Sequence, residues 1–269
     1  ASFDFGIDLR YRYEGVEQDG PLESADANTL RVRAHLASRT FAGFSGLVEV
    51  DHVEGIGAQQ YNDTRNGEIV FPVVADPEGT DLNQAWLQYT PRADTRVRIG
   101  RQRDNLANQR FVGPSDWRQT EQTHDAIDVE TTAIGRLTVT FAFHDRVIRV
   151  FGPDAGSPPA SFNGASHLLN VKLSPFAAGS IVGYAYLLDF DEAPQLSCRS
   201  IGARYDGSHA IRERLSAGWA VEYADQGDPA DNPHEVNPSY ALLELRLTAG
   251  DADFSVGREI LSGVAGNAD

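Results

Sequence analysis

The chain has 269 residues, which suits one large β domain or two ordinary domains. Its formal net charge of −16 argues against nonspecific nucleic-acid binding. The mean hydropathy is −0.36, and the sequence holds no run of about eighteen apolar residues, which excludes a transmembrane helix. It does not exclude membrane-spanning strands, because such a strand shows only every second residue to lipid.

The basic residues are almost all arginines, since Lys172 is the only lysine among 23 basic residues. Arginine keeps its charge in confined places and offers a planar fork to carboxylate or phosphate. Codon usage in a GC-rich genome explains the excess equally well. The single cysteine, Cys198, cannot form an intramolecular disulfide.

The first segment, residues 3–13, alternates most clearly between apolar and polar side chains. Its apolar residues are Phe3, Phe5, Ile7, Leu9, Tyr11 and Tyr13, and the polar ones between them include Arg10 and Arg12. A period of two over about eleven residues predicts a strand long enough to cross the hydrocarbon of a bilayer.

Similar alternation recurs along the rest of the chain. The further segments are 30–36, 44–51, 84–89, 96–99, 127–130, 136–144, 169–173, 182–190, 197–205, 215–223, 241–247 and 254–256. Together these segments predict an all-β protein with about thirteen strands.

The connections between these segments alternate in length. Residues 14–28, 53–81, 103–124 and 146–163 form long polar connections, whereas the reversals near 39, 91–94, 132–135 and 174–179 are short. Up-and-down barrels of the bacterial outer membrane sort their connections in this way. The pattern predicts an antiparallel up-and-down transmembrane β-barrel.

A soluble, carbohydrate-binding β-sandwich is the alternative fold, because its strands also alternate. It would bury the apolar face and leave the polar face wet, whereas a porin turns its apolar face to lipid. The sandwich predicts burial of Leu137, Val139, Phe141 and Phe143.

Both ends of the chain lead to expectations about the complete protein. The chain begins Ala1-Ser2-Phe3 without Met, which fits an exported protein whose signal peptide has been removed, although an engineered start would look identical. About thirteen strands is odd for a closed bacterial barrel, and the polar segment 266–269 does not form a closing aromatic strand. We expect residues 1–269 to be one barrel domain that lacks the last strands of about 16 to 18.

The predicted polar face carries many charges. Arg10 and Arg12 lie on the first segment and Arg31 and Arg33 on the second, so a hairpin would make them one cationic ladder, and Arg96 and Arg98 share the same phase. Rings of Arg and Lys select anions in pores. Asp128 and Glu130 point the same way, so the alternative is a wall lattice whose charges neutralise one another. Acidic loop residues such as Asp76 are expected to be solvated.

Residues 100–127 resemble the alginate-export family of outer-membrane porins. The matching pieces are Gly100-Arg101-Gln102, Gln109-Arg110-Phe111-Val112-Gly113, Trp117-Arg118-Gln119 and Asp125-Ala126-Ile127, with support from residues 82–86 and 257–263. The resemblance implies a monomeric barrel of about eighteen strands that moves an anionic uronate polysaccharide through an arginine-rich constriction, which Arg110 and Arg118 would line or brace. Pro114-Ser115-Asp116 departs from the family pattern.

The long segment 104–124 has two interpretations. It is either an exposed loop or a segment folded into the lumen, with Arg110 and Arg118 anchored on wall carboxylates such as Asp128 or Glu130. We expect the second arrangement, because Phe111 and Trp117 need burial.

Signals of enzymatic chemistry are lacking in the sequence. It contains no G-x-S-x-G elbow, P-loop, HExxH or Cys-rich motif, and its seven histidines show no ligand spacing. We therefore expect no enzyme, cofactor or metal. The predicted function is an outer-membrane channel for a hydrophilic, anionic solute or polysaccharide, with outer-membrane lipid and lipopolysaccharide as its surroundings. A general or uptake porin is the alternative.

Overall fold

A computed structural model describes residues 3–154, 156–176, 179–228, 232–234 and 237–263. The chain start at residues 1–2 and the polar end at 264–269 lie outside the described residues. Among the residues that are described, no helix is long and apolar enough to cross a bilayer.

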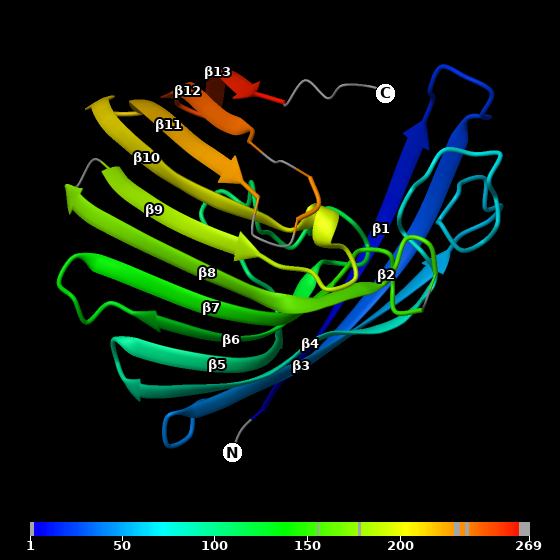
Figure 1. The fold of residues 1–269 in the computed structure, drawn as a ribbon, viewed down its shortest axis with the longest axis horizontal. Coiled ribbons are helices and arrows are strands. Elements are labelled where there is room, and N and C mark those ends of the chain that lie inside the picture. Colours follow the sequence, from blue (N-terminus) through cyan, green and yellow to red (C-terminus); the bar gives the residue numbers. More distant parts are fainter. Residues whose placement is uncertain (1–2, 155, 177–178, 229–231, 235–236, 264–269) are drawn as a thin grey trace. The chain divides into compact units, whose positions relative to one another are not determined.

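In the described part of the chain, thirteen strands follow one another in chain order in a single sheet (Figure 1). The strands are β1 (Phe3–Val16), β2 (Ala25–Ser38), β3 (Phe44–Gly55), β4 (Gly79–Arg92), β5 (Thr95–Gln102), β6 (Thr123–Thr131), β7 (Leu137–Ile148), β8 (Ser161–Phe176), β9 (Gly179–Leu188), β10 (Cys198–Arg212), β11 (Leu215–Gly227), β12 (Ser239–Ala249) and β13 (Ala252–Leu261). Neighbouring strands are antiparallel, as in the pair β1–β2, whose register runs from Phe3 opposite Ser38 to Val16 opposite Ala25. The all-β, up-and-down prediction is confirmed.

The connections alternate in length as the sequence predicts. Residues 93–94, 213–214 and 250–251 form tight turns, whereas residues 17–24, 56–78 and 103–122 are long connections. Two of the tight turns contain left-handed backbone, at Arg214 with φ of 60° and Gly250 with φ of 63°. Positive φ suits short hairpin turns because it matches the twist of the flanking strands.

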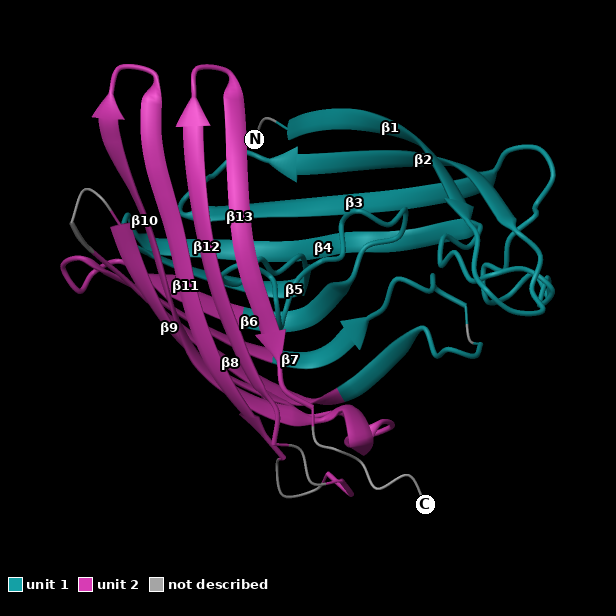
Figure 2. Cartoon of the chain, turned by 90° about the horizontal axis from the view of Figure 1, so that it is seen from above, with its two compact units in different colours: residues 1–127, 144–163 teal, residues 128–143, 164–269 magenta. Residues whose placement is uncertain are grey.

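The chain divides into two compact units (Figure 2). Unit 1 contains residues 1–127 and 144–163, and unit 2 contains residues 128–143 and 164–269. The boundaries fall within β6, β7 and β8, so each of these strands contributes to both units.

Unit 1 exposes its apolar strand face and covers its polar one. On β1, Phe3, Ile7 and Leu9 have 62%, 61% and 66% of their surface exposed, whereas Arg31 and Arg33 on β2 retain only 4% and 8%. A soluble protein of ordinary design buries the apolar residues instead. The pattern is that of strands whose apolar face meets lipid.

Unit 2 shows the same inverted polarity. Phe141 is 44% exposed, and Leu137, Val139 and Phe143 are only partly buried. Glu222 on β11 and Asn170 on β8 are buried. The β-sandwich alternative is wrong, because it required the four apolar side chains of β7 to be buried, namely Leu137, Val139, Phe141 and Phe143.

A small apolar cluster in unit 1 anchors the connection between β3 and β4. Tyr61 and Val74 from residues 56–78 pack on Ala25 and Ala27 at the start of β2, and all four are buried. The backbone joins the same contact, since the N–H of Asp26 donates to the carbonyl of Gln60 at 2.9 Å. This packing holds the connection over the ends of the strands and places Asp76 on the polar side.

Candidate functional site

The inward loop, residues 103–122 between β5 and β6, lies on the polar face of unit 1. Gln119 fixes it to two strands, because its Nε2 donates to the carbonyl and hydroxyl oxygens of Thr29 at 3.1 and 2.8 Å, and its Oε1 accepts from Arg10 Nε at 3.0 Å. Gln119 is fully buried. A buried amide with its donor and acceptor atoms bonded in this way stabilises one loop position.

Arg10 on β1 binds the backbone of the same loop. Its guanidinium donates to the carbonyl of Asp116 at 2.7 Å and to the carbonyls of Trp117 and Arg118. Carbonyl oxygens that point to one side of a loop attract a cation without cancelling its charge. The side chain that was predicted to attract solute therefore holds the loop against the strands.

Arg33 lies at the centre of a buried ion cluster. It donates two bonds of 2.6 Å to Asp51 on β3 and one of 2.9 Å to Glu121 of the inward loop, with Glu49 at 3.8 Å. Arg103 also donates to Glu121, at 2.7 Å. Burial opposes ionisation of Glu121, but Arg33 outweighs this effect and holds the pKa of Glu121 below its usual value.

Asp76 joins the two long connections. It accepts a bond from Arg12 and a second, of 2.9 Å, from the backbone N–H of Gln119. The expectation that Asp76 is a solvated loop residue is wrong, because its side chain has no exposed surface. Because residues 56–78 pack on the ends of the strands, Asp76 lies beneath the inward loop.

Arg118 has a different partner from the one expected. It pairs with Glu14 at 3.3 Å, and Glu14 also accepts from Arg12, so β1 supplies the anchor that was predicted at Asp128 or Glu130. Arg110 is exposed on the loop. The predicted inward position of the loop is found, with a wall carboxylate from a different strand.

Trp117 is 57% exposed, so the expectation of its burial is wrong. Its ring lies 4.0 Å from the guanidinium carbon of Arg118 and 5.4 Å from that of Arg12. Cation–π contact stabilises an exposed indole without covering it. Phe111, the other aromatic residue of the loop, is partly buried as expected.

The remaining predicted arginines of unit 1 fall into two groups. Arg31 is buried beside Arg10 and Arg33 and donates to Asp8 at 2.9 Å. Arg98 lies apart, stacked 4.2 Å from the Trp86 ring and bonded to Gln88 at 2.8 Å, with Arg96 on the same strand. The first group corresponds to the alternative of a lattice with neutralised charges more closely than to a free cationic ladder.

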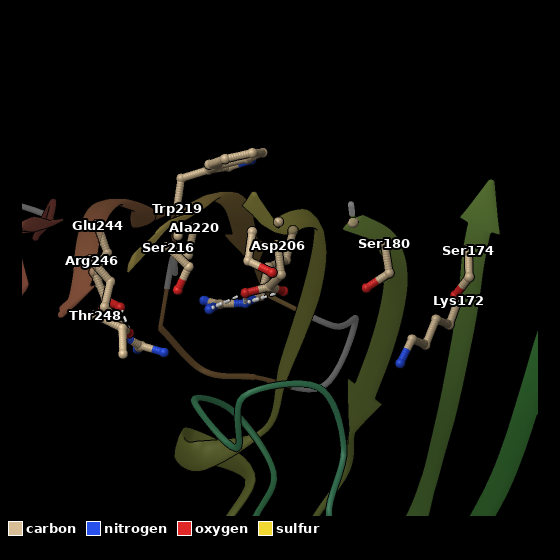
Figure 3. Close-up of a pocket in the computed structure, with 15 residues that line it drawn as sticks. Lys172, Ser174, Ser180, Asp206, Ser216, Trp219, Ala220, Glu244, Arg246 and Thr248 are labelled. Atoms are coloured by element: carbon tan, nitrogen blue, oxygen red, sulfur yellow. Dashed lines mark hydrogen bonds and ion pairs between the residues drawn. The ribbon is translucent and has the colours of Figure 1, made fainter. Parts of the chain in front are cut away.

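Unit 2 carries a second polar site on its own strands. A cavity of about 580 Å³ opens among residues of β8 to β12 (Figure 3). The polar side chains that line it are Lys172, Ser174, Ser180, Arg204, Asp206, Ser208, Ser216, Glu244, Arg246 and Thr248. The two predicted carboxylates of this unit lie on β6, where Asp128 is buried and Glu130 accepts a bond of 3.4 Å from Thr140.

The cations of this cavity differ in how strongly they are held. Arg204 is bound to Asp206 and to fully buried Glu222, at 2.6 and 2.9 Å. Arg246 is bound to Glu244 at 2.7 Å but keeps 57% of its side chain exposed. Lys172 is exposed, and no bonding partner for it exists among the residues that the structure describes.

The residues that line the cavity come from both faces of the sheet. Lys172, Asp206 and Arg246 project to one side of the strands, and the Trp219 ring projects to the other (Figure 3). Trp219 lies over Gly207, where a Cβ atom would come within 2.5 Å of its ring. The Trp219 ring of β11 and the charged side chains of β8, β10 and β12 therefore lie on opposite faces of the sheet.

The sequence profile described as alginate export matches residues 1–144, more than half of the chain. The chain belongs to the alginate export family. This result confirms the resemblance based on residues 100–127. The family consists of transport proteins, so the expectation that the chain is not an enzyme is also confirmed. No curated protein matches the chain by sequence.

Solved porin structures share the fold of this family member. OccAB3 and OccAB2 of Acinetobacter baumannii superpose with TM-scores of 0.78 and 0.76 at 12% and 14% identity. The outer membrane protein OpdK of Pseudomonas aeruginosa gives 0.73 at 11% identity. In each case the match covers 97% of this chain and 67% of the other, so the chain spans about two thirds of their length.

Three residues that matter to the site were not predicted from the sequence. Gln119, Glu121 and Asp76 all come from long connections and meet strands far away in the chain. One signal was present: the arginines at 31 and 33 needed more acidic partners than their own strands offer. This shortage indicates that loops fold back and bring acidic residues to the two arginines, but it does not indicate which acidic residues.

Proposed function

We propose that this alginate-export family member is a channel in a bacterial outer membrane for a hydrophilic, anionic solute or polysaccharide. The protein would be a monomer, and lipid and lipopolysaccharide would surround its apolar face. The family and the porin fold support a channel, and the charge of the solute is our inference from the polar faces of the two units.

The cavity of unit 2 carries this proposal. Its exposed cation Lys172 has no bonding partner among the described residues, and the same cavity is lined by five hydroxyl side chains, those of Ser174, Ser180, Ser208, Ser216 and Thr248. An ammonium group attracts a carboxylate, and hydroxyl groups exchange hydrogen bonds with sugar hydroxyls. Weak contacts of this kind allow a solute to enter and leave, as conduction requires.

Unit 1 supports a channel in a different way. Arg12, Arg31 and Arg33 are bonded to carboxylates, so they contribute little free charge for a solute. The inward loop lies over them on the polar face, and such a loop narrows the path beside the strands. We propose that unit 1 limits the size of the solute and that unit 2 supplies its attraction.

The selectivity of the full-length protein in planar bilayers tests this proposal. Replacing Lys172 or Arg246 by Ser should lower the permeability to anions about two- to threefold each, the effect of one charge in water at about 7 Å. Arg214→Ser is the matched control, because Arg214 lies in the tight turn between β10 and β11. Cation preference in the wild type, or equal effects of all three changes, would contradict the proposal.

A further inference from the structure

Two histidines and an aspartate of unit 1 meet at the base of the inward loop. Asp104 is the second residue of that loop, His124 is the second residue of β6, and His144 lies on β7. Both histidines are 4% exposed, and the side chain of Asp104 is 11% exposed. Three ionisable groups therefore converge in the interior, where each needs a polar partner to offset its burial.

The three side chains direct one ligand atom each to a common point. Asp104 Oδ2 lies 2.7 Å from His144 Nε2 and 3.5 Å from His124 Nδ1, and the three atoms all lie within 4.8 Å of one another. Ligands at about 2.0 to 2.1 Å around a tetrahedral metal ion are separated by about 3.3 Å. The measured separations lie on both sides of that value, so small side-chain movements would complete the site.

Hydrogen bonding accounts for only part of the cluster. His144 Nε2 lies at hydrogen-bond distance, 2.7 Å, from Asp104 Oδ2, whereas buried His124 Nδ1 has no hydrogen-bond partner within the described part of the chain. The two rings stack with centroids 4.2 Å apart, which keeps both nitrogens directed toward the carboxylate. Buried nitrogen and oxygen atoms without partners are unfavourable unless something binds them.

We propose that Asp104, His124 and His144 bind a divalent transition-metal ion such as Zn²⁺. Two imidazoles and one carboxylate form a common ligand set for zinc and for other ions that accept nitrogen ligands. These three ligands would leave the fourth position of a tetrahedral ion open to water. The site goes beyond the proposed transport function, which uses none of the three residues.

The position of the site gives the ion a structural effect. Asp104 lies near the first residue of the inward loop, and His124 follows its last residue by two positions. A metal bound to both would join the two ends of the loop and connect them to β7 through His144. It would therefore hold the base of the loop, while Arg10 holds residues 116–119 of the same loop.

Metal binding to the full-length protein, prepared without a polyhistidine tag and stripped with chelator, tests the proposal. We expect the stripped wild type to bind a single added Zn²⁺ ion and to retain it after dialysis. With added Co²⁺ in its place, we expect visible d–d bands. Asp104→Asn and His144→Gln should each weaken Zn²⁺ binding by at least about 100-fold. His52→Gln is the matched control, since His52 also lies beside a carboxylate, 3.5 Å from Glu54, but is half exposed.

The outcomes separate clearly. Retention by the wild type and by His52→Gln, with loss in the two cluster variants, supports the site. Failure of the wild type to bind Zn²⁺ or Co²⁺ would overturn it, and this measurement does not depend on folding of any variant. Equal binding by His144→Gln and the wild type would overturn it too, as would loss in His52→Gln. Circular dichroism of each variant checks that its strands form.

Discussion

At the scale of single residues, Arg33 shows why charge can be buried on the polar face of a porin strand. Its guanidinium is bonded to Asp51 and Glu121, and both carboxylates are almost completely buried. Such a group is costly to take out of water, and the cost is offset only while all partners are present. The cluster therefore depends on each of its members.

Replacing Arg33 by Ala should lower the free energy of unfolding by about 3 to 5 kcal/mol, because two buried carboxylates lose their shared cation. Urea unfolding of the full-length protein in lipid vesicles measures this loss. Arg214→Ala is the control, since its ion pair with Asp251 is largely exposed and should leave the free energy of unfolding unchanged. Equal stability of the two variants would show that the buried cluster is not structural.

At the scale of elements, the inward loop behaves as a separate piece attached by a few strong contacts. Gln119 bonds to β1 and β2, while Gln109 of the same loop is exposed and bonds to Asn105 and Leu106, which lie nearby in the same loop. The loop therefore has one fixed part and one outer part. Its attachment depends on contacts between residues about one hundred positions apart.

Replacing Gln119 by Ala should loosen the inward loop, because Thr29 and Arg10 lose a common partner. Single-channel recordings of the full-length protein should then show more frequent current fluctuations than in the wild type. Gln109→Ala, which removes the same residue type from the outer part of the loop, should leave the current trace unchanged. A quiet Gln119→Ala channel would mean that the loop does not border the path of ions.

At the scale of the whole molecule, both units expose apolar residues and cover polar ones. On β12, Leu245 is 53% exposed, and the adjacent Glu244 faces the cavity of unit 2. The two positions lie at similar depth along the strand and differ in the face they serve. They therefore offer a direct test of which face meets lipid.

Leu245→Arg should lower the free energy of unfolding in lipid vesicles by about 2 to 4 kcal/mol, the cost of Arg on a lipid-facing strand position near the membrane centre. Glu244→Arg should cost less than about 1 kcal/mol, since that site is open to water. Urea titration of both proteins makes the comparison. A larger loss in Glu244→Arg would reverse the assignment of the faces.

The strands could be predicted from the sequence because alternation is a local property. The apolar face of β1, for example, follows from every second residue of 3–13, and the lengths of the connections follow from the gaps between such segments. The contacts of the inward loop could not be predicted. Gln119 reaches Arg10 across 109 positions, and no local pattern marks that pair.

The candidate site was predicted in part for the same reason. Arg10, Arg12, Arg31 and Arg33 share a strand face, so their proximity follows from the hairpin register that places Arg10 opposite Arg31. Their partners Asp76 and Glu121 depend on how two long connections fold back. The metal ligands at 104, 124 and 144 come from three separate elements, which no short motif reveals.

The hold of Arg10 on the inward loop has a consequence for how this protein can be varied. Its guanidinium grips main-chain oxygens at positions 116 to 118, which every amino acid possesses. Exchanging the side chains at 116 and 117 would therefore leave this anchor intact. Substitutions at these two positions, engineered or natural, could therefore change the side chains that face a passing solute while the loop keeps its position on the strands.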